Sequence, residues 1–382
     1  MTDGAADRRW MTAALDIGRR GLGTTAPNPS VGCVLVREGR VVGRGWTQPG
    51  GRPHAEAEAL GRAGAEARGA TAYVTLEPCA HHGRTPPCAE ALIGAGVARV
   101  VTALEDPDSR VAGSGLARLA AAGIAVESGV CADIAACDLG GYLMRQRAGR
   151  PRFSLKLATS LDGRIATAGG DSRWITGTLA RARGHALRAS HDAVLIGIGT
   201  ALADDPMLTC RLPGVRRQTL RIVLDSQARL PADSRLAQTA AEHPVWQFTT
   251  AGEAAGDTTG EAPVRRFSVA ADSTGRTDPE AVAAALGAEG LNNVLVEGGG
   301  QVAASLMRAG LADRLYWFRA GLVLGGDARP AVGALGLDRV ADAGGWRLRS
   351  RKPCGGDLLE TWHREREAGG SPAQYRPCSP AS

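Results

Sequence analysis

The sequence His54-Ala-Glu56, followed by Thr75-Leu-Glu-Pro-Cys79-Ala-His-His-Gly-Arg-Thr-Pro-Pro-Cys88, carries the strongest structural signal in this chain of 382 residues. One histidine and two cysteines form the mixed nitrogen and sulfur ligand set that zinc favours, and three protein ligands leave a fourth position for water. The ligands lie where helices are expected to begin, and there the helix dipole and the metal would both favour thiolates. We therefore predict a zinc site at His54, Cys79 and Cys88.

The predicted catalytic residue of this site is Glu56. It lies two residues after the ligand histidine, close enough to a zinc-bound water to move protons without binding the metal. Water bound to zinc ionises near neutral pH and can then attack an amidine-like ring carbon. A His-x-Glu motif together with a Pro-Cys motif is typical of the zinc deaminases.

Two plainer interpretations of these residues stay open. Free cysteines are often small buried hydrophobes, and zinc is purely structural where four protein ligands close the site. No fourth ligand has comparable motif support, because His81 and His82 fit a loop or substrate contact better than an extra ligand. The remaining cysteines are expected to be packing or surface residues.

Strand-like and helix-like segments alternate around these motifs. In the first half, a hairpin is expected at 30–36 and 40–45, strands at 70–76 and 98–104, and helices at 54–67, 87–94 and 114–122. Such alternation predicts a sheet covered by helices.

A second alternating set follows a polar linker segment at 146–152 that contains glycine and proline. Here strands are expected at 153–158, 193–197, 220–224, 245–249, 293–297 and 314–318, and helices at 179–190 and 301–309. Residues 251–260 and the tail after Arg366 are expected to be flexible.

The bulk composition indicates a globular protein of two domains. The chain is too long for one ordinary core, and 44% hydrophobic with 22% charged residues is typical of folded proteins. No apolar run approaches the roughly 20 residues of a membrane span, and no signal peptide is evident, which favours the cytoplasm. The net charge of +6 is spread thinly, which argues against nucleic acid but is compatible with a phosphorylated small molecule.

Glycine-rich turns in the second half have an ambiguous meaning. Val294-Leu-Val-Glu-Gly-Gly-Gly300 precedes an expected helix, whose free N–H groups could bind a phosphate. Such turns also serve ordinary strand-to-helix connections, and Gly197-Ile-Gly-Thr200 is equally ambiguous. Neither turn matches Gly-x-Gly-x-x-Gly, so a Rossmann fold is not supported.

The spacing of the two cysteines leads to a family resemblance. Nucleic-acid deaminases usually carry Cys-x-x-Cys, whereas eight residues separate Cys79 from Cys88. This long loop and Ala26-Pro-Asn-Pro-Ser-Val-Gly-Cys33 resemble the bifunctional riboflavin-biosynthesis deaminase/reductase family from about Trp10 to about Trp362. The resemblance implies a cytidine-deaminase-like three-layer α/β/α domain (1–147), a dihydrofolate-reductase-like α/β domain (152–366) and a flexible tail (367–382).

In the first domain the resemblance implies zinc at the three residues named above, with Glu56 as the proton shuttle. It also implies that Asn28 and Arg84 contact the pyrimidine or its phosphate. One position departs from the family pattern, because many members read Gly-Tyr-His where this chain has Gly45-Trp46-Thr47. The substrate contact expected at that histidine is therefore in question here.

In the second domain the resemblance rests on the segments 156–166, 172–176 and 202–209. It implies that NADPH is bound by Ala158, Trp174, Thr200, Asp204, Ser226, Gly299, Gly300, Gln301, Val302, Ala303, Ala304 and Ser305. It likewise implies that the substrate is bound by Ser172, Arg188, Leu208, Arg211 and Glu297. The two arginines offer the bidentate donors that a phosphate prefers, although any single arginine could equally form a surface ion pair. Lys156 is expected to pair with an aspartate such as Asp162 or Asp205.

The reaction implied is zinc-dependent deamination of a phosphorylated diaminopyrimidinone, followed by NADPH-dependent reduction of its ribosyl group to ribityl. The resemblance also implies a homodimer or a higher oligomer. Three alternatives stay open: a nucleic-acid (tRNA-type) deaminase with an accessory domain, a homologue with only one active half, and a non-enzymatic protein with structural zinc.

Overall fold

The computed structural model describes residues 4–81, 86–215, 217–250 and 264–365, and their contacts divide the chain into two compact units. The first unit ends at Gly149 and the second begins at Arg150. Within the described residues, no helix combines the length and the apolar character that crossing a membrane requires. The predicted flexible segment 251–260 and the tail from 367 lie outside the described residues.

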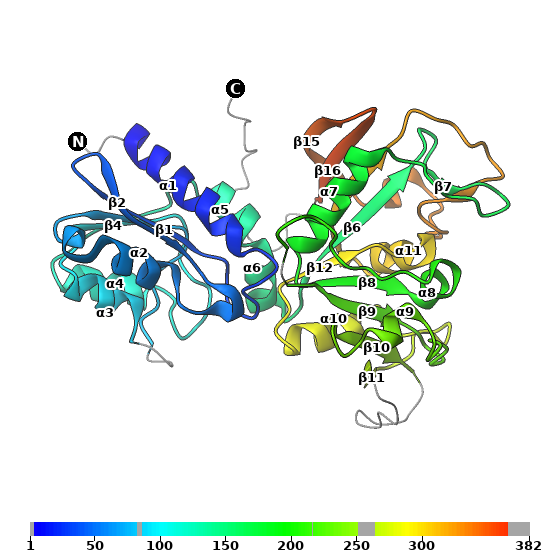
Figure 1. Cartoon of the computed structure of the whole chain (residues 1–382), viewed down its shortest axis with the longest axis horizontal. Coiled ribbons are helices and arrows are strands. Elements are labelled where there is room, and N and C mark those ends of the chain that lie inside the picture. The colour runs from blue at the N-terminus through cyan, green and yellow to red at the C-terminus, as the bar shows by residue number, and fades with distance from the viewer. Residues whose placement is uncertain (1–3, 82–85, 216, 251–263, 366–382) are drawn as a thin grey trace. The chain divides into compact units, whose positions relative to one another are not determined.

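The first unit is a five-stranded sheet with helices on both faces (Figure 1). The strand order is β2-β1-β3-β4-β5, with β1 antiparallel to both neighbours and β3, β4 and β5 parallel. The strands are β1 (Gly32–Arg37), β2 (Arg40–Trp46), β3 (Thr71–Val74), β4 (Arg99–Thr102) and β5 (Ala125–Ser128). The helices are α1 (Gly4–Gly18), α2 (Ala55–Ala63), α3 (Cys88–Gly94), α4 (Ser114–Ala121), α5 (Ala132–Asp138) and α6 (Gly140–Ala148).

Alternating strand residues build the two core layers of this unit. Leu35 and Val74 point into the cluster that contains side chains of α2, α3, α4 and α6. Their neighbours Val34 and Tyr73 point into the cluster of α1 and α5. Successive side chains of a strand face opposite sides, so one short strand supplies both layers.

Two glycines of β2 let α2 lie directly against the sheet. A Cβ on Gly45 would lie 2.4 Å from the carbonyl oxygen of Ala55, and one on Gly43 would lie 2.3 Å from that of Ala59. No other residue type fits that close approach. The contact seats the first turn of α2, and with it His54 and Glu56, at the edge of the sheet where β3 ends.

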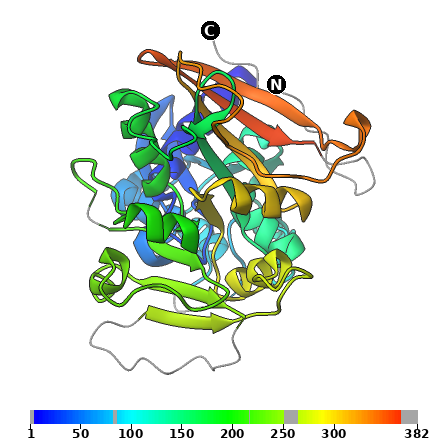
Figure 2. The ribbon, with the colours of Figure 1, turned by 90° about the vertical axis from the view of Figure 1, so that its right-hand side faces the viewer.

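The second unit is built on a nine-stranded sheet of order β11-β10-β9-β8-β12-β6-β13-β16-β15, which Figure 2 shows running from bottom to top. All strands from β11 to β13 are parallel, and β16 and β15 add an antiparallel edge. The strands are β6 (Arg152–Thr159), β8 (Ala193–Gly197), β9 (Leu220–Leu224), β10 (Val245–Thr249), β11 (Val264–Ser268), β12 (Asn293–Val296), β13 (Ala312–Arg319), β15 (Trp346–Cys354) and β16 (Asp357–Arg364); β7 (Arg164–Ala166) and β14 (Arg329–Pro330) form a separate pair. The helices are α7 (Thr178–Ala189), α8 (Ile198–Asp204), α9 (Arg235–Gln238), α10 (Pro279–Ala288) and α11 (Gly300–Arg308).

The strand order reverses direction between β8 and β12. The chain leaves β8 through α8 toward β9 on one side and leaves β12 through α11 toward β13 on the other. The two helices also pack on opposite faces of the sheet, with Ala201 of α8 in the core of one face and Ala303 of α11 in the core of the other. In open α/β sheets, ligands bind in the crevice that such a reversal opens at the carboxyl ends of the strands.

The predicted elements that the structure describes are present, with shifts at their ends. The main correction concerns the linker predicted at 146–152. Helix α6 continues to Ala148 and ends on Gly149 in a left-handed conformation, and β6 begins at Arg152, so only a few residues connect the units. Gln146 and Arg147, which were read as linker, lie in the last turn of this helix.

Candidate functional site

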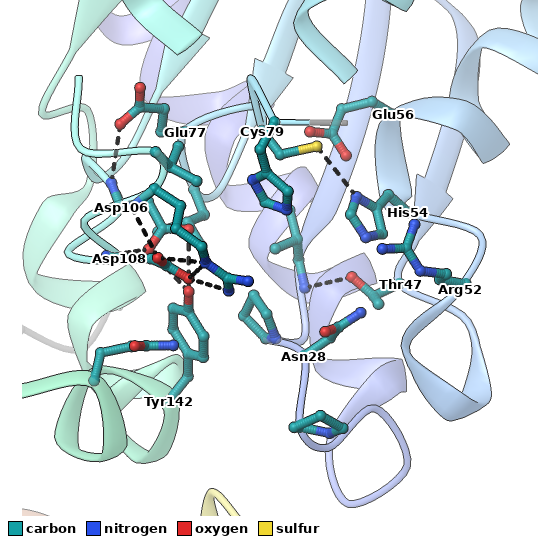
Figure 3. Close-up of a pocket in the computed structure, with 18 of the residues that line it drawn as sticks. Asn28, Thr47, Arg52, His54, Glu56, Glu77, Cys79, Asp106, Asp108 and Tyr142 are labelled. Atoms are coloured by element: carbon teal, nitrogen blue, oxygen red, sulfur yellow. Dashed lines mark hydrogen bonds and ion pairs between the residues drawn. The ribbon is translucent and has the colours of Figure 1, made fainter. Parts of the chain in front are cut away.

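A cavity of about 420 Å³ opens in the first unit, at the edge where β2, β3 and β4 end (Figure 3). These three strands run in the same direction, since β1 is antiparallel to both β2 and β3, so the segments that follow them meet at one edge. The lining includes His54, Glu56, Cys79, Asp106 and Tyr142. The site therefore combines residues that lie far apart in the sequence.

The three predicted metal ligands converge on one side of this cavity. His54 Nδ1 lies 3.7 Å from Cys79 Sγ and 3.4 Å from Cys88 Sγ, and all three ligand atoms lie within 4.8 Å of one another. A tetrahedral zinc with bonds of about 2.3 Å to sulfur and about 2.0 Å to nitrogen separates such ligands by about 3.5 Å. Both the donor types and their spacing fit zinc.

The charge of this cluster is shared between its members. A hydrogen bond from Cys88 lowers the pKa of the Cys79 thiol to about 4, and the same bond raises the pKa of Cys88. The hydrogen bond to Cys79 also raises the pKa of His54. One thiolate is thus present before any metal binds, and the nearby metal charge would deprotonate the second thiol.

Glu56 is buried beside the cluster, with 3% of its surface exposed. Burial raises the pKa of its carboxyl to about 7, while the charge of His54 opposes the shift. A carboxyl with a pKa near neutral can both accept and release a proton at the operating pH, which is the requirement for a proton shuttle.

The cavity wall opposite the metal cluster is the loop between β4 and α4. A single buried carboxylate, that of Glu77, holds this loop in place. Glu77 Oε2 accepts hydrogen bonds from the backbone N–H groups of Asp106 (3.1 Å) and Gly113 (3.0 Å). Its Oε1 accepts from those of Gly115 (2.8 Å) and Leu116 (3.2 Å). One side chain thus fixes the loop between β4 and α4 at both ends.

This loop presents Asp106 and Asp108 to the cavity (Figure 3). The Tyr142 hydroxyl lies 2.9 Å from Asp106 Oδ1 and 3.2 Å from Oδ2, and burial raises the pKa of the Asp106 carboxyl. Asp108 is bound by the Arg110 guanidinium at 2.5–3.2 Å, which lowers the pKa of Asp108. The sequence interpretation missed this wall. The acidic motif Asp106-Pro-Asp108, just after the strand predicted at 98–104, could have indicated it.

Of the further residues expected here, Asn28 lines the cavity and its amide donates to the Gly51 carbonyl oxygen at 2.7 Å. Thr47, in the position of the missing histidine, is buried, lines the cavity and accepts from the Val31 N–H at 3.0 Å. His81 also lines the cavity. Arg84 and His82 lie outside the described residues.

In the second unit, two predicted substrate residues bind each other. Arg188 of α7 forms a bidentate ion pair with Glu297, Nε–Oε1 at 2.6 Å and Nη2–Oε2 at 3.0 Å, and its Nη1 donates to the Thr209 carbonyl oxygen. Lys156 Nζ lies 3.9 Å from Glu297 Oε2, so its carboxylate partner is this glutamate and not Asp162 or Asp205 as expected. Arg211, by contrast, is exposed and contacts His185.

Several predicted cofactor residues meet at the reversal between β8 and β12. A Cβ on Gly197 would lie 2.8 Å from Val302 Cγ2, and one on Gly299 would lie 3.8 Å from Thr200 Oγ1, so the segments that follow the two strands lie close together. Glu297 directly follows β12 at the same edge. Ala158 lies near the end of β6, and Ser226 follows β9. Gly300 and Gln301 begin α11.

The remaining predicted residues divide by exposure. Ser172, Trp174 and Asp204 are exposed, Trp174 to 68%, and Ser305 is half-buried on α11. Three others are buried: Leu208, Ala303 and Ala304 are at most 4% exposed, and Leu208 and Ala303 belong to the hydrophobic core. Their side chains pack within the protein, and the ligand contacts expected of these three residues stay predictions.

Comparison with known proteins identifies the family. Residues 5–104 match the cytidine and deoxycytidylate deaminase zinc-binding region, and residues 151–359 match the RibD C-terminal domain. Over 364 residues the chain is 43% identical to the riboflavin biosynthesis protein RibD of Escherichia coli K12, which spans 92% of this chain and 98% of that protein. The chain belongs to the RibD family.

Solved structures agree with this RibD assignment. A RibD structure from Acinetobacter baumannii superposes with a TM-score of 0.85 at 36% identity, covering 95% of this chain and 100% of that one. A diaminohydroxyphosphoribosylaminopyrimidine deaminase/5-amino-6-(5-phosphoribosylamino)uracil reductase from Thermotoga maritima superposes at 0.83 with 32% identity, covering 94% and 99%.

The family membership confirms the two folds expected from the sequence, cytidine-deaminase-like and then dihydrofolate-reductase-like. As a RibD-family protein, the chain is a bifunctional enzyme of riboflavin biosynthesis, with a zinc-dependent deaminase domain and an NADPH-dependent reductase domain. The alternative of a nucleic-acid deaminase with an accessory domain is set aside, because the second unit is itself the RibD reductase domain.

Proposed function

We propose that the first unit hydrolyses the C2 amine of 2,5-diamino-6-(5-phosphoribosylamino)pyrimidin-4(3H)-one, and that the second then reduces the ribosyl group of the product to ribityl. The single observation that carries the first half is the convergence of His54, Cys79 and Cys88 beside a buried Glu56. The Thermotoga maritima relative, a deaminase and reductase of this chemical class, supports the choice of substrate.

In the deaminase site, His54, Cys79 and Cys88 would hold zinc, which supplies the Lewis acidity that ionises a water near neutral pH. Glu56 takes up the proton of that water and delivers a proton to the leaving amine, releasing ammonia. Its burial and its pKa near 7 suit both transfers. Asn28 and Arg84 are proposed to contact the pyrimidine or its phosphate, and Thr47 lines the same pocket.

In the reductase site, bound NADPH would supply the hydride for reduction at C1 of the ring-opened ribose. The loops after β8 and β12 are proposed to hold the cofactor through Thr200, Gly299 and Gly300, with Ala158, Trp174, Asp204 and Ser226 around them. The proximity of the two loops at the sheet reversal supports this placement. The residues 301–305 on α11, which are Gln301, Val302, Ala303, Ala304 and Ser305, complete the proposed cofactor contacts.

The proposed substrate residues of the reductase are Ser172, Arg188, Leu208, Arg211 and Glu297. All three nitrogens of the Arg188 guanidinium bind protein oxygens, so Arg188 orients Glu297 and Arg211 is the better phosphate partner. The exposed position of Arg211 leaves its guanidinium accessible from solvent. Positioning and electrostatics would dominate the hydride step.

We assign residues 1–147 to the deaminase, 152–366 to the reductase and 367–382 to a tail, with a cytoplasmic location and a homodimer or higher oligomer. The thinly spread charge of the chain supports a small phosphorylated partner and no nucleic acid.

The proposal is tested by following ammonia release and NADPH oxidation separately on this pyrimidine, with zinc measured on the same sample. Ammonia release first, NADPH oxidation afterwards and about one zinc per chain are expected. Zinc without ammonia release would contradict the substrate assignment and point to the pocket around Thr47. Ammonia release without NADPH oxidation would mean that only one half is active.

A further inference from the structure

The cavity of the first unit has a second polar wall, opposite the metal cluster, to which the proposed chemistry assigns no role. Figure 3 shows Asp106 and Tyr142 on one side of the cavity and His54, Glu56 and Cys79 on the other. Asp106 is only 7% exposed and Tyr142 only 6%. A buried carboxylate costs free energy unless its lone pairs are used, so this wall calls for an explanation.

Asp106 is held in a fixed orientation by three groups. Its N–H donates to Glu77, its Oδ1 accepts from the Asp108 N–H at 3.0 Å, and the Tyr142 hydroxyl binds its carboxylate. The Oδ1 atom therefore accepts two hydrogen bonds, from the Asp108 N–H and from the Tyr142 hydroxyl. Oδ2 has only the longer contact of 3.2 Å with Tyr142, and a carboxylate oxygen accepts more than one hydrogen bond.

The neighbouring acid is engaged elsewhere. Asp108 is bound by Arg110 through three contacts of 2.5–3.2 Å, which use both of its oxygens. Asp106 is thus the acidic group of this wall with capacity for a ligand, and a carboxylate repels a phosphate. The wall suits a part of the substrate that donates hydrogen bonds.

We infer that Asp106, oriented by Tyr142, binds the 5-amino group of the pyrimidine. This inference rests on the proposed function, in which carbon 2 of the ring lies at the metal cluster. Carbon 5 lies directly across a six-membered ring from carbon 2, so the 5-amino group points to the wall opposite the metal. Asp106 there would select a 5-amino pyrimidine over one with hydrogen at that position, because the analogue leaves the buried acceptor unpaired.

The first test is Asp106→Asn in the full chain, which keeps the size of the side chain and removes its charge. The KM for deamination of the diaminopyrimidinone is expected to rise about tenfold to a hundredfold, since hydrogen bonds to charged groups are the strong ones. The reductase rate on the already deaminated substrate is expected to stay unchanged. About one zinc per chain in the variant would show that the first unit remains folded.

Tyr142→Phe tests the positioning role, and the chain offers a matched control. The Tyr73 hydroxyl donates to buried Asp7 at 2.8 Å on the other face of the same sheet, away from the cavity. Tyr142→Phe is expected to raise the KM about threefold to tenfold. Tyr73→Phe removes the same hydroxyl from a similar pair and is expected to leave the KM unchanged.

The decisive measurement uses a substrate analogue with hydrogen in place of the 5-amino group. The wild type is expected to prefer the parent substrate about tenfold or more, and Asp106→Asn is expected to lose most of that preference. An equal preference in both proteins, or an unchanged KM in Asp106→Asn, would overturn the inference. If the wild type releases no ammonia from the parent, the proposed function fails instead, and calorimetric binding of parent and analogue still decides the role of Asp106.

Discussion

At the scale of single residues, the deaminase site depends on a carboxyl whose ionisation is set by burial. Burial of Glu56 raises its pKa from about 4.5 to about 7, even though the charge of neighbouring His54 opposes the shift. An exposed glutamate at the same position would have an ordinary, lower pKa and would be a weaker base for taking up the proton of the water.

Glu56→Gln is therefore expected to lower the deamination rate by about a hundredfold to ten-thousandfold, because the amide cannot transfer the proton. Zinc content and NADPH oxidation on the deaminated substrate should be unchanged. Glu58→Gln is the matched control, since Glu58 lies on the same helix and pairs with Arg62 near the surface. Loss of both activities in a folded Glu56→Gln protein would contradict separate sites.

Removal of the metal should separate the two activities as well. Stripping zinc with a chelator is expected to abolish ammonia release and leave the reductase rate intact, with recovery when zinc is added back. Cys79→Ser is expected to purify with little zinc, whereas Cys131→Ser, outside the cluster, should keep about one zinc per chain. Deamination at full rate in a zinc-free sample would exclude a role for the metal.

At the scale of elements, the segments after parallel strands are what bring the site together. Cys79 follows β3 and Asp106 follows β4, and Glu77 connects the two segments by accepting N–H groups from both ends of the second. The carboxylate replaces the backbone partners that this loop lacks.

Glu77→Gln should release this loop, because an amide nitrogen cannot accept the N–H groups that one carboxylate oxygen now binds. We expect the first unit to lose about 1–3 kcal/mol of stability and the KM for deamination to rise. Thermal unfolding and steady-state kinetics measure both effects. Glu66→Gln removes an exposed partner of Arg40 and should change neither. An unaltered KM in Glu77→Gln would show that the loop keeps its shape without the carboxylate.

The features that depend on neighbouring residues could be predicted from the sequence. Strands with strong alternation and the zinc ligands, which are marked by a compact motif, could be recognised from neighbouring residues. Helix α6 was not predicted, because its polar last turn resembles a linker, and β15 with its irregular pairing to β16 shows no clean alternation. The pair of Asp106 with Tyr142 joins positions 36 residues apart, and only the packing of α6 brings them together.

At the scale of the whole molecule, the second unit depends on a buried ion pair for its acid stability. Burial alone would raise the pKa of Glu297, but the charge and hydrogen bonds of Arg188, with Lys156, lower it to about 2. A depressed carboxyl pKa stabilises the folded state above its ordinary value of 4.5. That contribution disappears as the pH falls from about 4.5 toward 2.

The expected result is a difference in unfolding free energy between wild type and Glu297→Gln that is largest above pH ~5 and shrinks as the pH falls. Urea denaturation at a series of pH values, monitored by a probe in the second unit, measures it. Glu289→Gln removes a partner of exposed Arg265 and should give a small difference at every pH. A difference in unfolding free energy between wild type and Glu297→Gln that stays constant down to pH ~3 would refute the stabilising role of the Glu297 ion pair.

The placement of Tyr142 on α6 has a consequence for exchanging modules between enzymes. The match to the deaminase family ends at residue 104, just before Asp106 and well before Tyr142. A chimera joined at that boundary would inherit its metal ligands from one parent and the facing wall of its pocket from the other. The smallest transferable deaminase module therefore extends through Ala148, where α6 ends. Ligand preference would follow the parent that supplies this last helix.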